Sequence, residues 1–488
     1  MKKLISMILA AVLVQSLAAC APSSNGGETT TAADNDAAGQ LLVGYGRADI
    51  TPMDSVPLQG YGITEQRMSQ GFLSKMYAIA LAITDAQGET AIVIACDACW
   101  FNADTTTEIA NKISEQCGVD ADKVITAALH QHSAPDMYND KAPSGITYRK
   151  EVFIPGAVAA AKAAMENRAA ATVQSTKIET ENMNFVRHYK MEDGTYAGDN
   201  FGNWKLKPVG HSNDGDNDLQ LVKFVRQGQK TQDGKDAKDI ILTNFQGHPH
   251  MGSGATSYSA HSDLVGVYRD TLEEKLDCQV IYFSGAGGDM NMTSRIEEEN
   301  LTDKDYKRHG KKLADLVIDA QDTFADMEFS AVKGTKVSFY ADYNGINDAD
   351  LVQKATEAWN YYLETGSEEL VKKYGFQSKY EAAAIITADE LPEGGNNFDI
   401  FALSFGDLAF IAAPYEMFNQ SGVAVKEGSP FKMTMIASIA NGGEGYLPTA
   451  VAWDYGCYEQ YSSSYARGTA ENLVDAYVGM LKDLHGQY

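Results

Sequence analysis

The chain is predicted to be an α/β protein in which helices flank mixed β-sheets, and three observations lead to this prediction. Apolar runs of strand length recur along the sequence. Segments with helical periodicity lie between these runs, and such alternation is typical of α/β architectures. Hydrophobic residues make up 44% of the 488 residues, which is enough to build a substantial core.

The first predicted elements are two strands that form a hairpin. Residues 76–84 (MYAIALAIT) and 90–98 (TAIVIACDA) are apolar and are joined through the turn sequence DAQG. Residues 103–118 follow as a helix that Gly118 should end. Residues 123–130 (KVITAALH) are then expected to form the next strand.

The same alternation continues towards the C-terminus. Further strands are predicted at 239–248, 278–289, 400–416 and 432–441. Amphipathic helices are predicted at 262–276, 305–322 and 468–484. Residues 343–398 are helical in pattern, charged, and end in a Gly-Asn loop, so we expect a helical insertion beside the core that could act as a lid. No internal repeat is recognisable in the sequence.

The N-terminus has the order of a secretory signal. Residues 1–20 begin with two lysines, continue with an apolar stretch and end in the lipobox-like sequence LAAC, whose Cys20 would be lipidated. An uncleaved membrane anchor is the alternative, but the apolar stretch is shorter than the roughly 20 residues of a spanning helix. Residues 21–40 have no large apolar side chain and should be a flexible tether before a catalytic domain at 41–488. The expected location is extracytoplasmic, with a lipid anchor in the cell membrane.

Composition excludes some classes of partner and scaffold. The net charge of −26 argues against nucleic acid, because phosphate binding needs a basic surface. Apart from Cys20 there are five cysteines, an odd number that does not suggest a disulfide scaffold. Cys96 and Cys99 form a C-x-x-C within an apolar stretch, and we expect buried free thiols rather than a zinc or redox pair.

Polar residues gather where predicted strands end. The four strand exits are LHQHSAPD, GHPHMGSG, PYEMF and NGGEGYLPT, and two of them hold four of the nine histidines. Loops of this kind converge on one edge of a sheet. In a strand-like segment, alternation puts His130 and His132 on one side with Gln131 opposite. Imidazoles and a carboxylate are donors that zinc accepts in catalytic sites. The alternative is that each is an ordinary hydrogen-bonded loop residue.

The motifs taken together resemble, in order, the catalytic domain of the neutral/alkaline non-lysosomal ceramidase family. They are VGYGRADITP, PLQGYG, LHQHSAPD, FQGHPHMGSG, SAHSDLVGVYRDTLE, FSGAGGDMNM, APYEMFNQSG and NGGEGYLPT…CYEQY, between about Leu42 and Tyr461. The resemblance implies a zinc amidase that cuts the N-acyl bond of ceramide. By motif, it implies the zinc ligands His130, His248, Glu416 and Tyr446.

The resemblance also implies roles for neighbouring residues. His132 matches the second histidine of its motif, beside the metal-bound water, where an imidazole could shuttle a proton to the leaving amine. Arg187, in NFVRHY, matches an active-site arginine, and Tyr458 matches the second tyrosine, a donor to the substrate carbonyl. Both could stabilise negative charge on that oxygen. Zn²⁺ would lower the pKa of bound water and polarise the carbonyl.

Two departures from the family pattern affect the substrate that we expect. Asn291 occupies the place of a serine implicated in catalysis, and should only orient the carbonyl or the water. The chain ends about 30 residues after Tyr458, without the family's immunoglobulin-like domain. A shorter bacterial relative acting on N-acyl sphingosine or another N-acyl compound is therefore expected. The alternatives are a zinc hydrolase of an ester or other bond, and a non-catalytic solute-binding lipoprotein.

Overall fold

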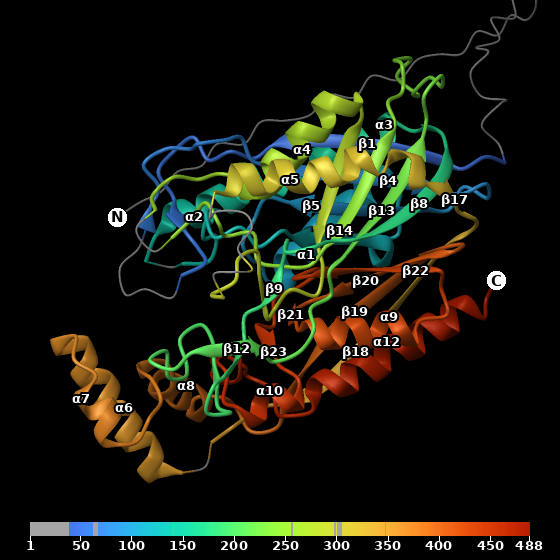
Figure 1. Cartoon of the computed structure of the whole chain (residues 1–488). Helices are drawn as coiled ribbons and strands as arrows, with labels where there is room; N and C mark the ends of the chain where they lie inside the picture. The colour runs from blue at the N-terminus through green and yellow to red at the C-terminus, as the bar shows by residue number, and fades with distance from the viewer. Residues whose placement is uncertain are drawn as a thin grey trace, which may run out of the picture. The chain divides into compact units, whose positions relative to one another are not determined.

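Three mixed β-sheets form the centre of the fold (Figure 1). The computed structural model describes residues 39–61, 67–139, 141–254, 257–296, 299, 305–346 and 348–488. Residues Ala38–Tyr488 cluster as one compact unit. The expected signal segment, Cys20 and nearly all of the expected tether lie outside the described residues.

The first sheet has the strand order β6-β5-β4-β1-β7. Its strands are β1 (Leu42–Asp49), β4 (Tyr77–Thr84), β5 (Thr90–Cys96), β6 (Val124–Ala128) and β7 (Ala169–Ala170). Strands β1, β4 and β5 pair antiparallel in turn, whereas β5 and β6 run parallel because helix α1 (Ala103–Cys117) crosses between them. Gly118 ends α1 with φ of 70°, as the sequence predicts. The 3₁₀ turn η1 (Ala121–Lys123) precedes β6, and α2 (Pro143–Tyr148), η2 (Arg149–Phe153) and α3 (Ile154–Glu166) lead to β7.

The second and third sheets have the same internal order. The second, β15-β14-β13-β8-β17, consists of β8 (Thr172–Glu179), β13 (Asp218–Val225), β14 (Ile240–Phe245), β15 (Gln279–Ser284) and β17 (Ala325–Asp326), with α4 (Asp263–Leu276), α5 (Tyr306–Asp319) and η4 (Gln321–Thr323). The third, β18-β19-β20-β22, consists of β18 (Val332–Asp342), β19 (Gly395–Phe405), β20 (Leu408–Ala413) and β22 (Met433–Ser438), with α9 (Asn419–Gly428) and α12 (Thr469–His485).

One arrangement of elements therefore occurs three times in the part of the chain that the structure describes. In each repeat the first three strands pair antiparallel, a helix crosses over, the fourth strand pairs parallel with the third, and another helix follows. The crossover helices are α1, α4 and α9, and the following helices are α3, α5 and α12. The sequence shows no repeat, so the repetition is one of topology.

This topology places three connections on the same edge as the strand exits. The first strand of each repeat runs in the same direction as the third and fourth, so their carboxyl ends share an edge of the sheet. The connection from the first to the second strand leaves from that edge in every repeat, through residues 50–76, 180–217 and 343–394. These connections hold β2 (Pro57–Leu58) and β3 (Arg67–Met68), then β9 (Phe185–Val186), β10 (Tyr189–Met191), β11 (Tyr196–Ala197) and β12 (Pro208–His211), then α6 (Ala349–Thr365), α7 (Glu369–Lys373) and α8 (Lys379–Asp389).

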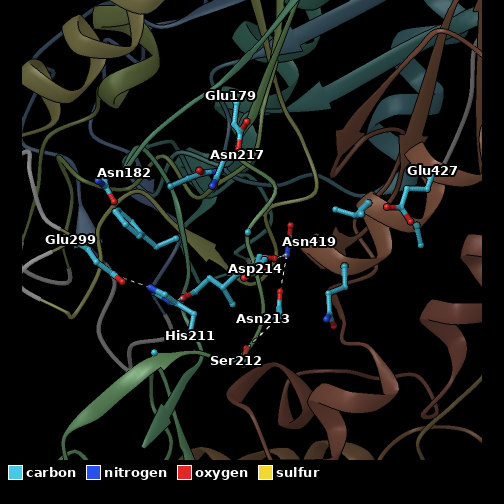
Figure 2. A pocket seen from close by; sticks show the side chains of 18 residues that line it. Glu179, Asn182, His211, Ser212, Asn213, Asp214, Asn217, Glu299, Asn419 and Glu427 are labelled. Carbon is cyan, nitrogen blue, oxygen red and sulfur yellow. Dashed lines mark hydrogen bonds and ion pairs between the residues drawn. The ribbon is translucent and has the colours of Figure 1, made fainter.

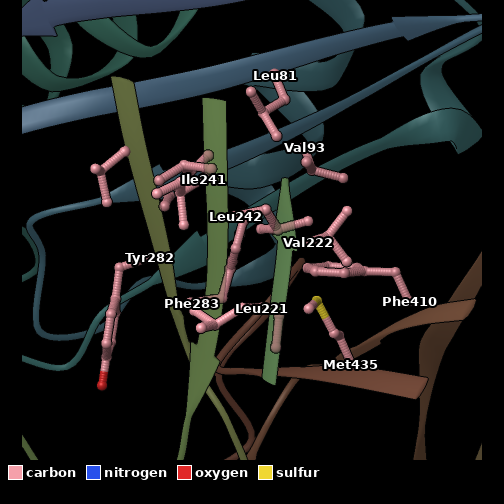
Figure 3. Packing of buried hydrophobic residues seen from close by; sticks show 14 of the residues in the cluster. Leu81, Val93, Leu221, Val222, Ile241, Leu242, Tyr282, Phe283, Phe410 and Met435 are labelled. Carbon is pink, nitrogen blue, oxygen red and sulfur yellow. The ribbon is translucent and has the colours of Figure 1, made fainter. Parts of the chain in front are cut away.

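The largest hydrophobic core joins the three sheets. Figure 3 shows Leu81 and Val93 of the first sheet near strands of the second, with Phe410 and Met435 of the third close to the same strands. The rings of Phe283 and Phe410 meet edge to face, with centroids 4.9 Å apart. Burying each such side chain stabilises the fold by about 1.5–3 kcal/mol. The core therefore holds the three sheets in one arrangement.

The α/β prediction with mixed sheets and a helical insertion is confirmed. The predicted helices correspond to α1, α4, α5 and α12, and the insertion to α6–α8, although β19 begins at Gly395, before the expected end of the insertion. Strands β1, β8, β13 and β18 and helices α3 and α9 were not predicted. The single strand expected at 400–416 is wrong, because β19 and β20 form an antiparallel pair that turns at Gly406. Cys96 and Cys99 are buried and unbridged. Among the described residues, no helix is both long and apolar enough to span a membrane.

Candidate metal centre

Three side chains from three repeats meet at one point. His130 follows β6, His248 follows β14 and Glu416 follows β20. The Nε2 atoms of His130 and His248 each lie 3.2 Å from Glu416 Oε2. His248 is 2% exposed and Glu416 is 9% exposed. The sequence analysis expected these loops to converge on one edge of a single sheet. This expectation is wrong, because the loops leave three different sheets and meet between them.

Backbone carbonyls orient both imidazoles. Nδ1 of His130 donates to the carbonyl oxygen of Cys99 at 2.7 Å, and Nδ1 of His248 donates to that of Met290 at 3.0 Å. A carbonyl oxygen can only accept, so each Nδ1 carries a proton and Nε2 is the nitrogen that can offer a lone pair to a metal ion once its own proton has left. Strand β6 ends two residues before His130, whose φ of 68° is rare for a residue with a side chain. This turn, rather than strand alternation, directs the ring.

Tyr446 lies beside this cluster on a short parallel strand pair. Strand β21 (Glu416–Met417) pairs with β23 (Tyr446–Leu447), so Glu416 and Tyr446 are direct neighbours. The Tyr446 hydroxyl is 3.4 Å from His248 Nε2. Burial, and then the charge of Glu416, raise the pKa of Tyr446 well above its ordinary value, and Arg187 opposes this. The four residues expected to bind zinc are thus brought together.

The donors fit a small tetrahedral cation. Zinc bonds of about 2.0–2.1 Å to nitrogen and oxygen correspond to donor separations of about 3.3 Å in a tetrahedron, close to the 3.2–3.4 Å found here. A cavity of about 20 Å³ touches His130, His248 and Glu416, which is room for roughly one water-sized species. Although burial opposes it, the charge of His130 and the hydrogen bonds from His130 and His248 hold the pKa of the Glu416 carboxyl well below its usual range. The carboxylate is therefore available as a ligand.

His132 lies next to the cluster but outside it. Its Nε2 is 3.3 Å from His130 Nε2, and its Nδ1 has no hydrogen-bond partner among the described residues. Its ring meets Tyr61 edge-on and lies 4.9 Å from the ring of His250. Burial, and then the charges of neighbouring histidines, hold the pKa of His132 well below its ordinary value. A neutral imidazole with a lone pair facing the centre can accept a proton.

A buried ion pair supports the loop that carries both histidines. Gln131 points away from the cluster, and its Nε2 donates to Asp97 Oδ1 at 2.7 Å. Asp97 Oδ2 accepts from Arg269 Nη2 of α4 at 2.6 Å, and both side chains are 1% exposed or less. Sequence reasoning missed Asp97 and Arg269, although Asp97 is a charged residue within the apolar run AIVIACDACWF, which is a sign of a buried ion pair.

Arg187 is held by a second buried network. Its Nη2 donates to the Tyr446 hydroxyl at 3.2 Å and to the Gly288 carbonyl at 2.8 Å, while its Nε donates to Glu459 Oε1 at 2.7 Å. The other carboxylate oxygen of Glu459 accepts from His188 Nε2 at 2.9 Å. Although burial opposes it, Arg187 and then His188 lower the pKa of Glu459 to about 2. Sequence reasoning missed Glu459. The only feature of the sequence that could have drawn attention to this glutamate is its position directly after Tyr458.

Tyr458 and Asn291 lie near this centre on different segments: Tyr458 follows β23, and Asn291 follows β15. The Tyr458 ring meets that of Tyr446 with centroids 5.9 Å apart. Asn291, on β16 (Met290–Asn291), bridges to His248 along the backbone. Its Oδ1 accepts from His250 Nε2 at 3.2 Å and its Nδ2 donates to Asp199 at 3.1 Å. The expected catalytic residues therefore surround the metal ligands, and their individual roles stay predictions.

A larger cavity lies apart from the centre. It measures about 1190 Å³, and Figure 2 shows the polar side chains that line it, with His211 bound to Glu299. None of the three metal-cluster residues lines it. Its lining includes Phe185 and Val186 of β9, which precede Arg187 in the chain, and Asn419, which follows Glu416 by three residues. The candidate metal site and this larger cavity are thus separate features.

Comparison with known proteins agrees with the fold. Residues 41–232 match the family model described as neutral/alkaline non-lysosomal ceramidase, N-terminal. Neutral ceramidase from Pseudomonas aeruginosa has the same fold, with a TM-score of 0.67 and 16% identity, covering 92% of this chain and 75% of that one. A ceramidase complexed with C2 gives a TM-score of 0.67 and 17% identity, covering 92% and 76%. No curated protein matches the chain in sequence. The resemblance to ceramidases is confirmed, by sequence over residues 41–232 and by fold over most of the chain.

Proposed function

We propose that the chain is a zinc-dependent hydrolase that cleaves the amide bond of an N-acyl compound. The observation that carries this proposal is the meeting of His130, His248 and Glu416 at 3.2 Å, with Tyr446 beside them. Two imidazoles, a carboxylate and a phenol are a donor set suited to Zn²⁺. The likeness to ceramidases supports an N-acyl sphingosine or a related amide as substrate.

The chain's own residues supply the remaining chemistry. A divalent cation bound here lowers the pKa of bound water to roughly 7 and polarises a carbonyl oxygen. His132 is neutral and faces the centre, so it can take up a proton and deliver it to the leaving amine. Arg187 and Tyr458 can donate hydrogen bonds to the carbonyl oxygen as negative charge develops on it. Asn291 carries an amide, which is not a nucleophile, so no acyl-enzyme is required.

The location is part of the same proposal. The lysines, apolar stretch and LAAC sequence of residues 1–20 support export and lipidation of Cys20. Residues 21–40 then tether the catalytic domain to the cell membrane. An anchored enzyme at the membrane surface would meet lipid N-acyl substrates directly.

Metal analysis of the purified mature protein, followed by a substrate panel, tests the proposal. We expect about one zinc per chain, and amide hydrolysis that a chelator abolishes and added Zn²⁺ restores. The panel contains N-acyl sphingosine, N-acyl amino acids and matched esters. Cleavage of esters alone would favour an esterase, and a small molecule bound by metal-free protein would favour a solute-binding protein.

A further inference from the structure

A second cavity lies between the helical insertion and the loop that carries Tyr458. It measures about 280 Å³. Helix α8 forms one wall, with Tyr380, Ala383, Ala384, Thr387 and Ala388, followed by Leu391 just after the helix. The opposite wall consists of Tyr458, Tyr461, Ser462, Ser463 and Ser464. The first set recurs every three or four residues, so one face of α8 lines the cavity.

The insertion has its own core, which fixes the orientation of α8. Ala382 and Ile385 on the other face of α8 are buried with Ala355 and Ala358 of α6 and with Phe376. Two faces of one helix therefore have different partners. Rotation of α8 about its axis would expose this small core, so the lining face is held towards Tyr458.

Two tyrosine ring contacts link the wall of the cavity to the metal centre. Tyr380 meets Tyr458 edge-on, with ring centroids 6.0 Å apart. Tyr458 meets Tyr446 at 5.9 Å, and the Tyr446 hydroxyl is 3.4 Å from His248 Nε2. A substrate whose carbonyl lies beside Tyr458 is therefore within reach of the α8 wall.

The walls suit hydrocarbon rather than a charged or sugar-like group. No acidic or basic side chain lines the cavity among the described residues. Three of the hydroxyls on its walls already donate to backbone carbonyls: Ser462 to Tyr458 at 3.1 Å, Ser463 to Tyr465 at 3.4 Å and Thr387 to Ala383 at 3.1 Å. Alanine methyl groups cover much of the α8 wall. Apolar surface of this kind favours aliphatic chains.

We propose that this cavity is a subsite for one unbranched hydrocarbon chain of the substrate, with Ala383 and Ala384 leaving the room that it occupies. The proposal rests on the proposed function of the metal centre. The volume of the cavity is near the lower end of the range for ligand pockets, about 300–1,000 Å³. The cavity can therefore take one hydrocarbon chain rather than a whole two-chain lipid.

Filling the cavity tests the subsite by binding, independently of turnover. Decanoate and acetate share a carboxylate and differ only in the length of the hydrocarbon chain. Calorimetric titration of the zinc-loaded full-length protein with each therefore measures how much the hydrocarbon chain contributes to binding. We expect the wild type to bind decanoate at least tenfold more tightly than acetate. Ala384→Trp and Ala383→Trp should each weaken decanoate binding at least tenfold and leave acetate unchanged. Ala349→Trp, at an exposed position that does not line the cavity, is the matched control.

The opposite results overturn the subsite: no chain-length preference in the wild type, or unchanged decanoate affinity in both folded, zinc-loaded lining variants. Circular dichroism and zinc content confirm folding. Turnover of N-decanoyl and N-acetyl amides of one amine, and of N-acetyl-decylamine, then shows whether the chain belongs to the acyl or the amine side. Chain-dependent binding without any amide hydrolysis would refute the proposed function alone, because the subsite is tested by binding.

Discussion

Replacing Arg269 with methionine should destabilise the folded chain by about 3 kcal/mol. Arg269 Nη2 lies 2.6 Å from Asp97 Oδ2, and both side chains are at most 1% exposed. Methionine fills similar space without the charge, so the Asp97 carboxylate would stay buried with hydrogen bonds only from Gln131 and the backbone N–H of Tyr77. Breaking a buried pair by removing one partner costs about 3–5 kcal/mol.

The lower end of that range applies for a reason visible in the structure. The Nε and Nη1 atoms of Arg269 are buried without hydrogen-bond partners among the described residues. Methionine removes these unsatisfied donors, which offsets part of the loss. The double variant Asp97→Asn/Arg269→Met removes both charges and should recover at least about 1 kcal/mol of the single-variant loss.

Urea unfolding of metal-free protein, followed by fluorescence, measures these differences without a contribution from bound metal. Arg467→Met is the matched control, because Arg467 makes the same kind of pair with Asp454 at the surface, where their side chains are 53% and 67% exposed. The control should lose less than about 1 kcal/mol. An equal loss in Arg269→Met and Arg467→Met would refute the argument that burial makes the first pair costly.

Four further predictions concern the site. His248→Ala should lose zinc, since too few donors remain to compete with water, and full zinc content by elemental analysis would contradict the centre. Glu459→Gln should keep zinc but lower kcat more than it raises KM, because Arg187 loses its charged partner; steady-state kinetics that match the wild type would exclude this positioning role. Asn291→Ser should retain zinc and change rate or substrate preference, and in the wild type rapid-quench mass spectrometry should find no acyl adduct within residues 284–294. Burial raises the pKa of Asp263 to about 7. Its protonated form therefore stabilises the fold at low pH, and this contribution is lost as the pH rises from about 4 through 7. Asp263→Asn should remove up to about 4 kcal/mol of this pH dependence, and parallel stability–pH curves for the variant and the wild type would contradict the prediction.

Much of the fold could be predicted because its central strands are buried on both faces. Continuous apolar runs such as those of β4 and β5 stand out from their surroundings. Strands β8 and β18 were missed because they are partly exposed and their sequences are mixed. The threefold repetition was invisible, since it preserves topology while the connections between first and second strands differ in length and in secondary structure.

The metal ligands could be predicted because histidine is rare in this chain and clusters at strand ends. The left-handed backbone conformation of His130 could not be predicted, because it depends on contacts with Cys99 and Ala98 rather than on local sequence. Glu459 was also beyond reach, because what distinguishes it is burial against Arg187, some 270 residues away in the chain. Side chains that act through long-range contacts carry little local signal.

The repeated topology has a thermodynamic consequence. Each repeat contributes one donor to the cluster: His130 from the first, His248 from the second and Glu416 from the third. An ion held by all three would be released when any one repeat opens, so its binding free energy would oppose partial unfolding of each repeat as well as unfolding of the whole. A centre shared in this way would link the cooperativity of three sheets to the concentration of a single metal ion.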